Sequence, residues 1–252
     1  MANRYFIKLS FIGANYHGWQ TQKNANSVQT ILNDAISIML KEKITTTGAG
    51  RTDAGVHARE FFAHFDTIHD LDETLRKELI LHLNGYLPGD IGIHEIFLVQ
   101  PDAHARFSAV SRTYQYIIAR TKDPFLHGFA YYYSVPLDIQ RMNEGATIIK
   151  SCSDFTAFAK LPGDTKTNIC HITDIFWEKK KDQFLFTITA DRFLRNMVRA
   201  IVGTLIDLGR GKNDLGNLKV IIESRNRSLA GMSVPACGLY LTSIIYPPKF
   251  FN

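Results

Sequence analysis

The stretch TTTGAGRTDAGVHA, residues Thr45–Ala58, places one aspartate in a run of glycines. Three glycines within eight residues indicate a backbone that turns sharply or closely approaches another group. Asp53 follows Arg51 by two residues, so the loop carries a carboxylate and a guanidinium that a simple connection would not need. Most aspartates in such loops only stabilise turns, so both a structural and a functional role are open for Asp53 at this point.

Several common motifs do not fit this stretch. A dinucleotide-binding loop would need a third glycine where Asp53 stands, and a phosphate-binding Walker loop would need a Gly-Lys-Ser/Thr ending. An aspartic protease would need two carboxylates that share a proton. Another Asp-x-Gly, at Asp207, sits at the end of a well-patterned helix.

Around the glycine loop, strands and helices follow one another without regular alternation. Residue spacing predicts a strand at 5–11, a helix capped by Ser27, and a helix from about Asp72 to Gly85 with Leu75, Leu79 and Leu83 facing inward. Further strands are expected at 59–67, 91–100, 111–121, 171–190 (a hairpin) and 238–247, with helices at 139–151, 193–211 and 214–224. This order predicts an α+β fold with a mixed, largely antiparallel sheet.

The predicted helix at 193–211 offers a cation. Its apolar stripe runs through Leu194, Met197, Val198, Ile201 and Leu205, with Arg195 and Arg199 one turn apart at the edge. An arginine at such an edge can bury its stem and present its charge to a neighbouring pocket. A reactive carboxylate in a dry pocket needs a nearby cation to stay charged, and one of these arginines could supply it. We expect at least one of the two arginines to be an ordinary surface residue.

Tyr114 lies in the predicted strand at 111–121 and follows Arg106 and Arg112 in the basic half of the chain. Aromatic residues at alternate strand positions usually belong to the core. An aromatic ring near arginines also suits the stacking of a nucleic-acid base beside phosphate contacts. The pattern leaves both roles open.

Composition and charge limit the class of protein. The 252 residues include three widely spaced cysteines and nine scattered histidines without an HxxxH pair, so we expect neither a disulfide framework nor a metal site. No apolar run has the length of a membrane span and no apolar signal region opens the chain, so we expect a cytoplasmic protein.

The charge changes along the chain. Residues 1–105 hold 9 Lys and Arg against 12 Asp and Glu, a net charge of −3, whereas residues 106–252 hold 20 against 12, a net charge of +8. We therefore predict two domains, an N-terminal one at 1–105 with Asp53 and a basic C-terminal one at 106–252 with Tyr114 and Arg199. A basic second half suits a phosphate-rich partner, but on charge alone an ordinary soluble surface is as good an explanation.

Motifs spread over nearly the whole chain resemble the family of tRNA pseudouridine synthases that act on the anticodon stem-loop. They are GANYHGWQTQ with SVQTIL, GAGRTDAGVHA, NGYLPGDI, DAHARFSAVSRTYQYII, SDFTAF, FLRNMVRAIVGTL and PACGLYLTSIIY. The combination of GRTDAGVHA with HARFSA and RTYQY is highly specific. The resemblance implies two similar α/β halves, a mixed sheet flanked by helices, and a central cleft for RNA.

The resemblance also implies a role for five residues. Asp53 matches the essential aspartate, and Arg199 matches the basic residue that forms an ion pair with it. Tyr114 matches a tyrosine that stacks on the target uracil, Arg51 an arginine that helps to hold the flipped nucleotide, and Leu239 an apolar residue beside the base pocket. One departure is Val-Pro-Ala-Cys before Gly238, where a small, polar or charged run is expected.

The implied activity is isomerisation of uridine to pseudouridine, at tRNA positions 38–40, without a cofactor or metal. The implied partners are tRNA and a second copy of the chain, as a homodimer, with no membrane. Two alternatives stay close to this: a catalytically silent RNA-binding module of the same fold, and the same chemistry on other tRNA uridines. A nucleotide-dependent oxidoreductase is disfavoured by the missing third glycine.

Overall fold

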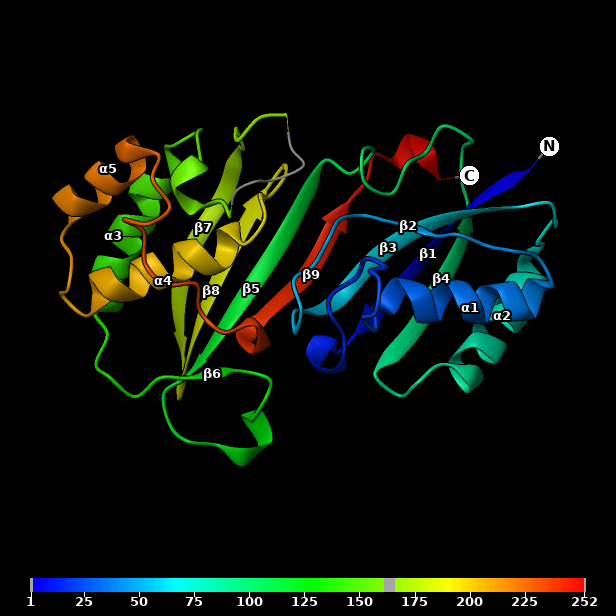
Figure 1. The fold of residues 1–252 in the computed structure, drawn as a ribbon, viewed down its shortest axis with the longest axis horizontal. Helices are drawn as coiled ribbons and strands as arrows, with labels where there is room; N and C mark the ends of the chain where they lie inside the picture. Colours follow the sequence, from blue (N-terminus) through cyan, green and yellow to red (C-terminus); the bar gives the residue numbers. More distant parts are fainter. Residues whose placement is uncertain (1, 161–165, 252) are drawn as a thin grey trace. The chain divides into compact units, whose positions relative to one another are not determined.

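The computed structural model describes residues 2–160 and 166–251, which form two compact units (Figure 1). The first unit combines Met1–Val110 with Leu241–Asn252, and the second is Ser111–Tyr240. Both units contain antiparallel strands covered by helices, and one short strand pair is parallel. The predicted α+β class with a mixed, largely antiparallel arrangement of strands is confirmed.

In the first unit, the strands lie in the order β4-β1-β3, with β2 paired to the other edge of β3. The register places Ile7 of β1 opposite Ala63 of β3 and Ile96 of β4, and both pairings are antiparallel. The elements are β1 (Asn3–Phe11), α1 (Val28–Leu40), β2 (Thr47–Gly48), β3 (His57–Thr67), α2 (Glu73–Tyr86) and β4 (Ile91–Leu98).

Side-chain caps start both helices of this unit. Ser27 accepts a hydrogen bond from the Thr30 amide (3.3 Å), and Asp72 accepts one from the Leu75 amide (2.8 Å), so both predicted helix starts are confirmed. Leu79 and Leu83 are buried as predicted, but Leu75 is exposed. The prediction for Leu75 was wrong because α2 buries side chains through its later turns and not through its first.

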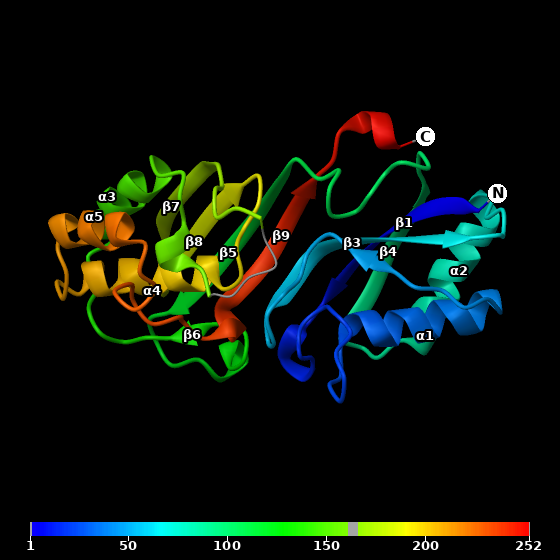
Figure 2. The same ribbon diagram turned by 45° about the horizontal axis from the view of Figure 1, so that its top comes forward.

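Both faces of the first unit's strands are covered. Tyr5, Ile7 and Leu9 alternate with Phe6 along β1, and all four are fully buried. The Phe6 ring lies edge-on to the rings of Tyr246 (5.2 Å) and of Phe251 in the C-terminal segment (6.0 Å). Figure 2 shows α1 and α2 on one side of these strands and the C-terminal segment on the other. The last residues of the chain therefore complete the core of the first unit.

The second unit contains the strand order β5-β8-β7, antiparallel throughout, and β6 pairs with β5 in parallel. Its last strand, β9, begins in this unit and continues into the first from Leu241. The elements are β5 (Ser111–Ala119), β6 (Tyr131–Tyr132), α3 (Ile139–Lys150), β7 (Ile172–Lys180), β8 (Gln183–Ala190), α4 (Met197–Gly209), α5 (Leu215–Ser224) and β9 (Leu239–Ile245).

Helix α4 is buried on all sides, except at Arg199 and Asp207. A Cβ atom on Gly203 would lie 1.8 Å from the Met232 carbonyl oxygen, so the segment around Met232 passes directly over the helix backbone. Only glycine permits so close an approach. No helix in the described ranges 2–160 and 166–251 is long and apolar enough to cross a membrane.

The start of α4 differs from the prediction. Asn196 adopts a left-handed conformation (φ 65°) and the helix begins at Met197, so the exposed Arg195 lies before it. The prediction that Arg195 and Arg199 lie one turn apart on the same helix is therefore wrong, because the left-handed Asn196 stands between them and interrupts the helix. Arg199 is the member of the pair that belongs to the helix.

Candidate active site

Asp53 lies in the loop between β2 and β3 of the first unit. The Val56 amide donates to the Asp53 carbonyl oxygen (3.2 Å), which closes a tight turn, and Gly55 within that turn has a φ of +79°. A residue with a Cβ atom is strained at such an angle, so the turn requires its glycine. The Asp53 side chain is half-buried and Arg51 is exposed.

A second loop, residues 13–19, holds the Asp53 loop in place. The Trp19 amide donates to Thr52 Oγ1 (3.0 Å), and the Gly55 amide donates to the Tyr16 carbonyl oxygen (3.3 Å). Gly18 has a φ of +86°, and a Cβ atom there would lie 2.1 Å from the Thr52 carbonyl oxygen. The residues on both sides of Asp53 are thus fixed by backbone contacts that tolerate no side chain at Gly18.

The second loop is itself anchored at Asp90. The Asp90 carboxylate accepts hydrogen bonds from the Tyr16 hydroxyl and from Asn15 Nδ2 (3.0 Å), and its carbonyl oxygen accepts one from the Ile12 amide (2.9 Å). Burial, together with the hydrogen bond to Asp90, raises the pKa of Tyr16 above its usual value, so its hydroxyl remains a donor. Asp90 therefore supports the Asp53 loop through one intermediate loop.

Helix α1 and the neighbouring aromatic rings fix the far end of the second loop. The first amides of α1, Val28 and Gln29, donate to the carbonyl oxygens of Gly18 (3.4 Å) and Trp19 (3.0 Å). The Trp19 ring packs on Phe61 of β3, with 4.3 Å between ring centroids. Amides at a helix start lack partners within the helix, so their use here orients the loop without cost to α1.

In the second unit, Tyr114 lies on β5 opposite Ile188 of β8 and is half-buried. Its ring meets the edge of the Phe193 ring at 5.1 Å and 86°. Arg112, two residues earlier, donates to the Asp191 carbonyl oxygen (2.7 Å). The Tyr114 ring is therefore supported by Phe193 from the segment that leads into α4.

Arg199 is held at the surface of α4 by the segment that crosses the helix. Its Nε donates to the Val234 carbonyl oxygen (2.7 Å), and the Val234 amide donates back to the Arg199 carbonyl oxygen (3.3 Å). Burial raises the pKa values of Tyr116 and Cys237, and the charge of Arg199 opposes both shifts. The guanidinium thus lies close enough to Tyr116 and Cys237 to favour negative charge there.

Leu239 is buried at the start of β9, directly after a short 3₁₀ turn at Ala236–Gly238. A Cβ atom on Gly238 would lie 2.8 Å from Tyr116 Cζ, so the turn packs tightly on β5. Cys237 in this turn has a raised pKa because of burial, and it stays a neutral thiol. The unexpected Val-Pro-Ala-Cys run therefore supplies a small uncharged residue before Gly238.

The structure thus places the predicted site residues in two groups. Asp53 and Arg51 share one loop of the first unit, whereas Tyr114, Arg199 and Leu239 belong to the second unit. Sequence reasoning had missed the supporting residues, which are Tyr16, Gly18, Thr52 and Asp90. Their only signal was their presence in the quoted motifs GANYHGWQTQ, GAGRTDAGVHA and NGYLPGDI, which composition and spacing alone do not explain.

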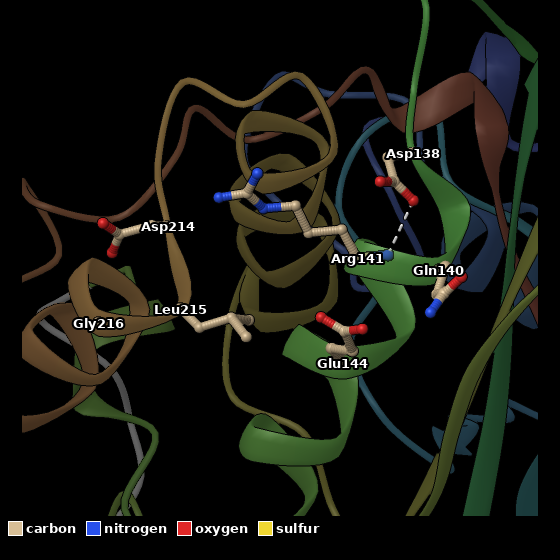
Figure 3. A pocket seen from close by; sticks show the side chains of 7 residues that line it. All are labelled: Asp138, Gln140, Arg141, Glu144, Asp214, Leu215 and Gly216. Atoms are coloured by element: carbon tan, nitrogen blue, oxygen red, sulfur yellow. Dashed lines mark hydrogen bonds between the residues drawn. The ribbon is translucent and has the colours of Figure 1, made fainter.

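A separate hollow of about 530 Å³ lies on the second unit between the starts of α3 and α5 (Figure 3). Asp138 and Asp214 in its wall cap these helices by accepting hydrogen bonds from the amides of Arg141 (3.0 Å) and Asn217 (2.7 Å). Helix capping accounts for both carboxylates. Within residues 2–160 and 166–251, no three His, Cys, Asp or Glu side chains are grouped to hold a metal ion.

Comparison with known proteins identifies the relatives of this chain. A family model described as tRNA pseudouridine synthase matches residues 8–84 and 152–247. The chain is similar to tRNA pseudouridine synthase A of Porphyromonas gingivalis, with 49% identity over 98% of this chain and 99% of that protein. The corresponding proteins of Bacteroides thetaiotaomicron (47% identity over 99% of this chain and 93% of that protein) and Acetivibrio thermocellus (40%, 94% and 97%) are also similar.

Proposed function

We propose, because the chain belongs to the family of tRNA pseudouridine synthases, that it isomerises uridine to pseudouridine in the anticodon stem-loop of tRNA. The observation that carries this proposal is the near full-length similarity to proteins named for that activity. The rigid loop around Asp53 supports it, since the essential aspartate implied by the resemblance needs a fixed position. Positions 38–40 of tRNA are the expected targets.

The proposed reaction is an internal rearrangement. The bond between uracil N1 and ribose C1′ breaks, the base turns, and a new bond forms between C5 and C1′, while a hydrogen leaves C5 and N1 gains one. Nothing is oxidised and no group enters from outside, so the balance requires no co-reactant. The target base must first leave its stack, which costs on the order of a few kcal/mol.

We assign Asp53 as the catalytic residue and Arg199 as its ion-pair partner. Exclusion of water prevents it from reacting with the ribose once the glycosidic bond has broken. A dry pocket also favours a neutral carboxyl group. A guanidinium beside Asp53 would keep it ionised. The hydrogen bonds between Arg199 and Val234 support this role, because they fix the direction in which the arginine side chain leaves α4.

The other three residues are proposed to bind the target nucleotide. Tyr114 stacks on the uracil, which returns about 1–3 kcal/mol per base, and its half-buried ring supported by Phe193 is suited to that contact. Leu239 packs beside the base, and Arg51 holds the flipped nucleotide. The exposure of Arg51 is consistent with a partner outside the protein.

We further propose that the second unit carries much of the affinity for the tRNA backbone. Ser111–Tyr240 holds 18 Lys and Arg against 12 Asp and Glu, a net charge of +6, whereas the first unit has a net charge of −1. Contacts to phosphates supply the sequence-independent part of RNA binding. The resemblance also leads us to propose a homodimer that works in the cytoplasm, where tRNA is found.

Tritium release from tRNA labelled at uridine C5 tests the reaction directly, because C5 must lose its hydrogen. We expect release with the unaltered chain and with Asp70→Asn, a control at an exposed aspartate. Asp53→Asn should reduce release by at least about a hundredfold, the lower range for loss of a positioned acid or base. Binding without release by the unaltered chain would instead show a silent RNA-binding module.

A further inference from the structure

Phe107 is 75% exposed, in a segment of the first unit that otherwise contacts the fold closely. Large apolar side chains on a mobile loop are unremarkable, but here the backbone is fixed. The His104 imidazole accepts hydrogen bonds at Nδ1 from the amides of Arg106 (3.1 Å) and Phe107 (3.3 Å). The His104 amide donates to Ser108 Oγ (2.9 Å), so side chains of the segment organise its own backbone.

The same segment is tied to the core at Ala105. The Ala105 amide donates to Nδ1 of the buried His64 (3.1 Å), and the Ala105 carbonyl oxygen accepts from the Tyr246 hydroxyl (2.5 Å). Arg4 donates to the neighbouring Ala103 carbonyl oxygen (3.1 Å) while it forms a two-bond ion pair with Asp66 (2.7 Å for each bond). Phe107 is therefore presented to solvent by a rigid support.

A series of ring contacts leads from the core to Phe107. The Phe6 and His64 rings are 6.2 Å apart, the His64 and His104 rings 4.7 Å, and the His104 and Phe107 rings 4.4 Å. The Arg106 guanidinium lies over the Phe107 ring at 5.5 Å. The His64 and His104 rings meet edge to face (64°), so the contacts do not form one continuous stack, and the series ends at the exposed Phe107 ring with the Arg106 guanidinium over it. An exposed ring with a guanidinium next to it suits a flat group that is accompanied by negative charge.

We propose that Phe107 stacks on an unpaired base of the tRNA substrate and that Arg106 contacts an adjacent phosphate. Unpaired bases stack on aromatic rings and arginine planes, and every nucleotide brings a phosphate with its base. A protein partner would be expected to insert a side chain into a packed pocket, and a single ring at the surface offers none. The inference rests on the proposed function, and it adds a second base contact to the one proposed for Tyr114.

The ring can be tested by equilibrium binding of the full chain to unmodified tRNA. We expect Phe107→Ala and Phe107→Leu each to raise Kd about fivefold to a hundredfold, the loss of one base stack. Phe107→Tyr keeps a ring and should stay within about twofold. Ile68→Ala is the control, since Ile68 is 74% exposed in the same unit. The exposure of Phe107 predicts that the thermal midpoint of each variant will stay close to that of the unaltered chain.

Salt dependence separates the two parts of the proposal. Phe107→Ala should leave the slope of log Kd against log salt unchanged because phenylalanine carries no charge, while Arg106→Gln should reduce its magnitude by about one. Unchanged binding by Phe107→Ala, or equal binding by the Leu and Tyr variants, would overturn the stack. Tritium release is measured separately. If the chain releases no tritium but its binding of tRNA still depends on the Phe107 ring, the proposed function is wrong and the base stack at Phe107 is supported.

Discussion

At the scale of single residues, the first unit uses neutral imidazole rings to accept hydrogen bonds from backbone amides. His57 accepts one from Gly13 (3.1 Å) beside the Asp53 loop, His64 accepts one from Ala105 (3.1 Å), and His104 accepts two. A ring nitrogen accepts only when it carries no proton. The lowered pKa values of His64 and His104, caused mainly by burial, therefore link the stability of the folded state to pH.

His64 provides a prediction for acid stability. Burial, followed by the charges of Arg4 and His104, lowers the pKa of His64 to about 4, whereas an unfolded histidine titrates near 6.5. The contribution of the neutral His64 to stability is thus complete above pH 6.5 and is lost as the pH falls towards 4. Linkage gives a loss of about 3 kcal/mol in the free energy of unfolding by pH 4.

Urea unfolding between pH 7.5 and 4 measures this effect as a difference between chains. The difference in the free energy of unfolding between the unaltered chain and His64→Gln should be constant above pH 6.5 and should become smaller below it. Titration of the carboxylates affects both chains equally and cancels in this difference. His82→Gln, at an exposed position, should show no such narrowing. A gap for His64→Gln that stays constant down to pH 4 would contradict the prediction.

The sequence contains no sign of these amide contacts. Nine histidines are scattered without spacing that indicates a role, and an imidazole that accepts from an amide 41 or 44 residues away depends on tertiary structure. Asp53 was different, because neighbouring glycines and Arg51 marked it locally. Local chemistry could thus be predicted, and long-range hydrogen bonds could not.

At the scale of elements, the Asp53 loop is shaped by the loop at residues 13–19. The glycines around Asp53 predicted a sharp turn, and Gly55 with its positive φ confirms it. The sequence could not show which segment the turn would meet. Helix starts at Ser27 and Asp72 were predictable from capping residues, but the start of α4 depends on the left-handed conformation of Asn196, whose side chain makes no capping hydrogen bond.

Gly18→Ala tests whether the contact between the two loops matters for activity. The new Cβ atom would lie 2.1 Å from the Thr52 carbonyl oxygen at a φ of +86°, so Thr52 and Asp53 would have to move. We expect a loss of about 1–3 kcal/mol in stability. Tritium release should fall at least about tenfold under conditions where the variant is folded, since small displacements of a reactive group cost rate.

Gly85→Ala is the matched control for that variant. Gly85 lies inside α2 with open space around its position, so alanine there should stabilise the chain by about 0.5–1 kcal/mol through helix propensity. Its tritium release should equal that of the unaltered chain. Equal release by Gly18→Ala and Gly85→Ala would show that the loop contact does not position Asp53.

At the scale of the whole molecule, the chain builds the first unit from both of its ends. Leu241–Asn252 returns to the first unit after the whole of the second has been formed from Ser111–Tyr240. The sequence indicated a change near residue 105 through charge, but it gave no sign that the last residues would join the first ones. That association depends on aromatic rings that meet only after folding, such as Phe6 with Tyr246 and Phe251.

Phe251→Ala measures how strongly the returning segment stabilises the first unit. The Phe251 ring contacts the rings of Phe97 (5.4 Å) and Tyr246 (6.2 Å) as well as that of Phe6, and the residue pairs with Val99 in an isolated β-bridge. Truncation of a fully buried phenylalanine costs about 3–5 kcal/mol, and Phe251 is half-buried, so we expect a loss of about 2 kcal/mol.

The control for that truncation is Phe125→Ala, because Phe125 is 92% exposed and should contribute less than about 0.5 kcal/mol. Urea unfolding monitored by tryptophan fluorescence suits this comparison, since Trp19 lies in the first unit and Trp177 in the second. Each tryptophan is observed alone, Trp19 in a Trp177→Phe background and Trp177 in a Trp19→Phe background. If the returning segment stabilises mainly the first unit, Phe251→Ala should shift the unfolding transition reported by Trp19 more than the one reported by Trp177. Equal shifts would mean that the two units unfold together and that the chain's ends stabilise the whole molecule as one cooperative structure.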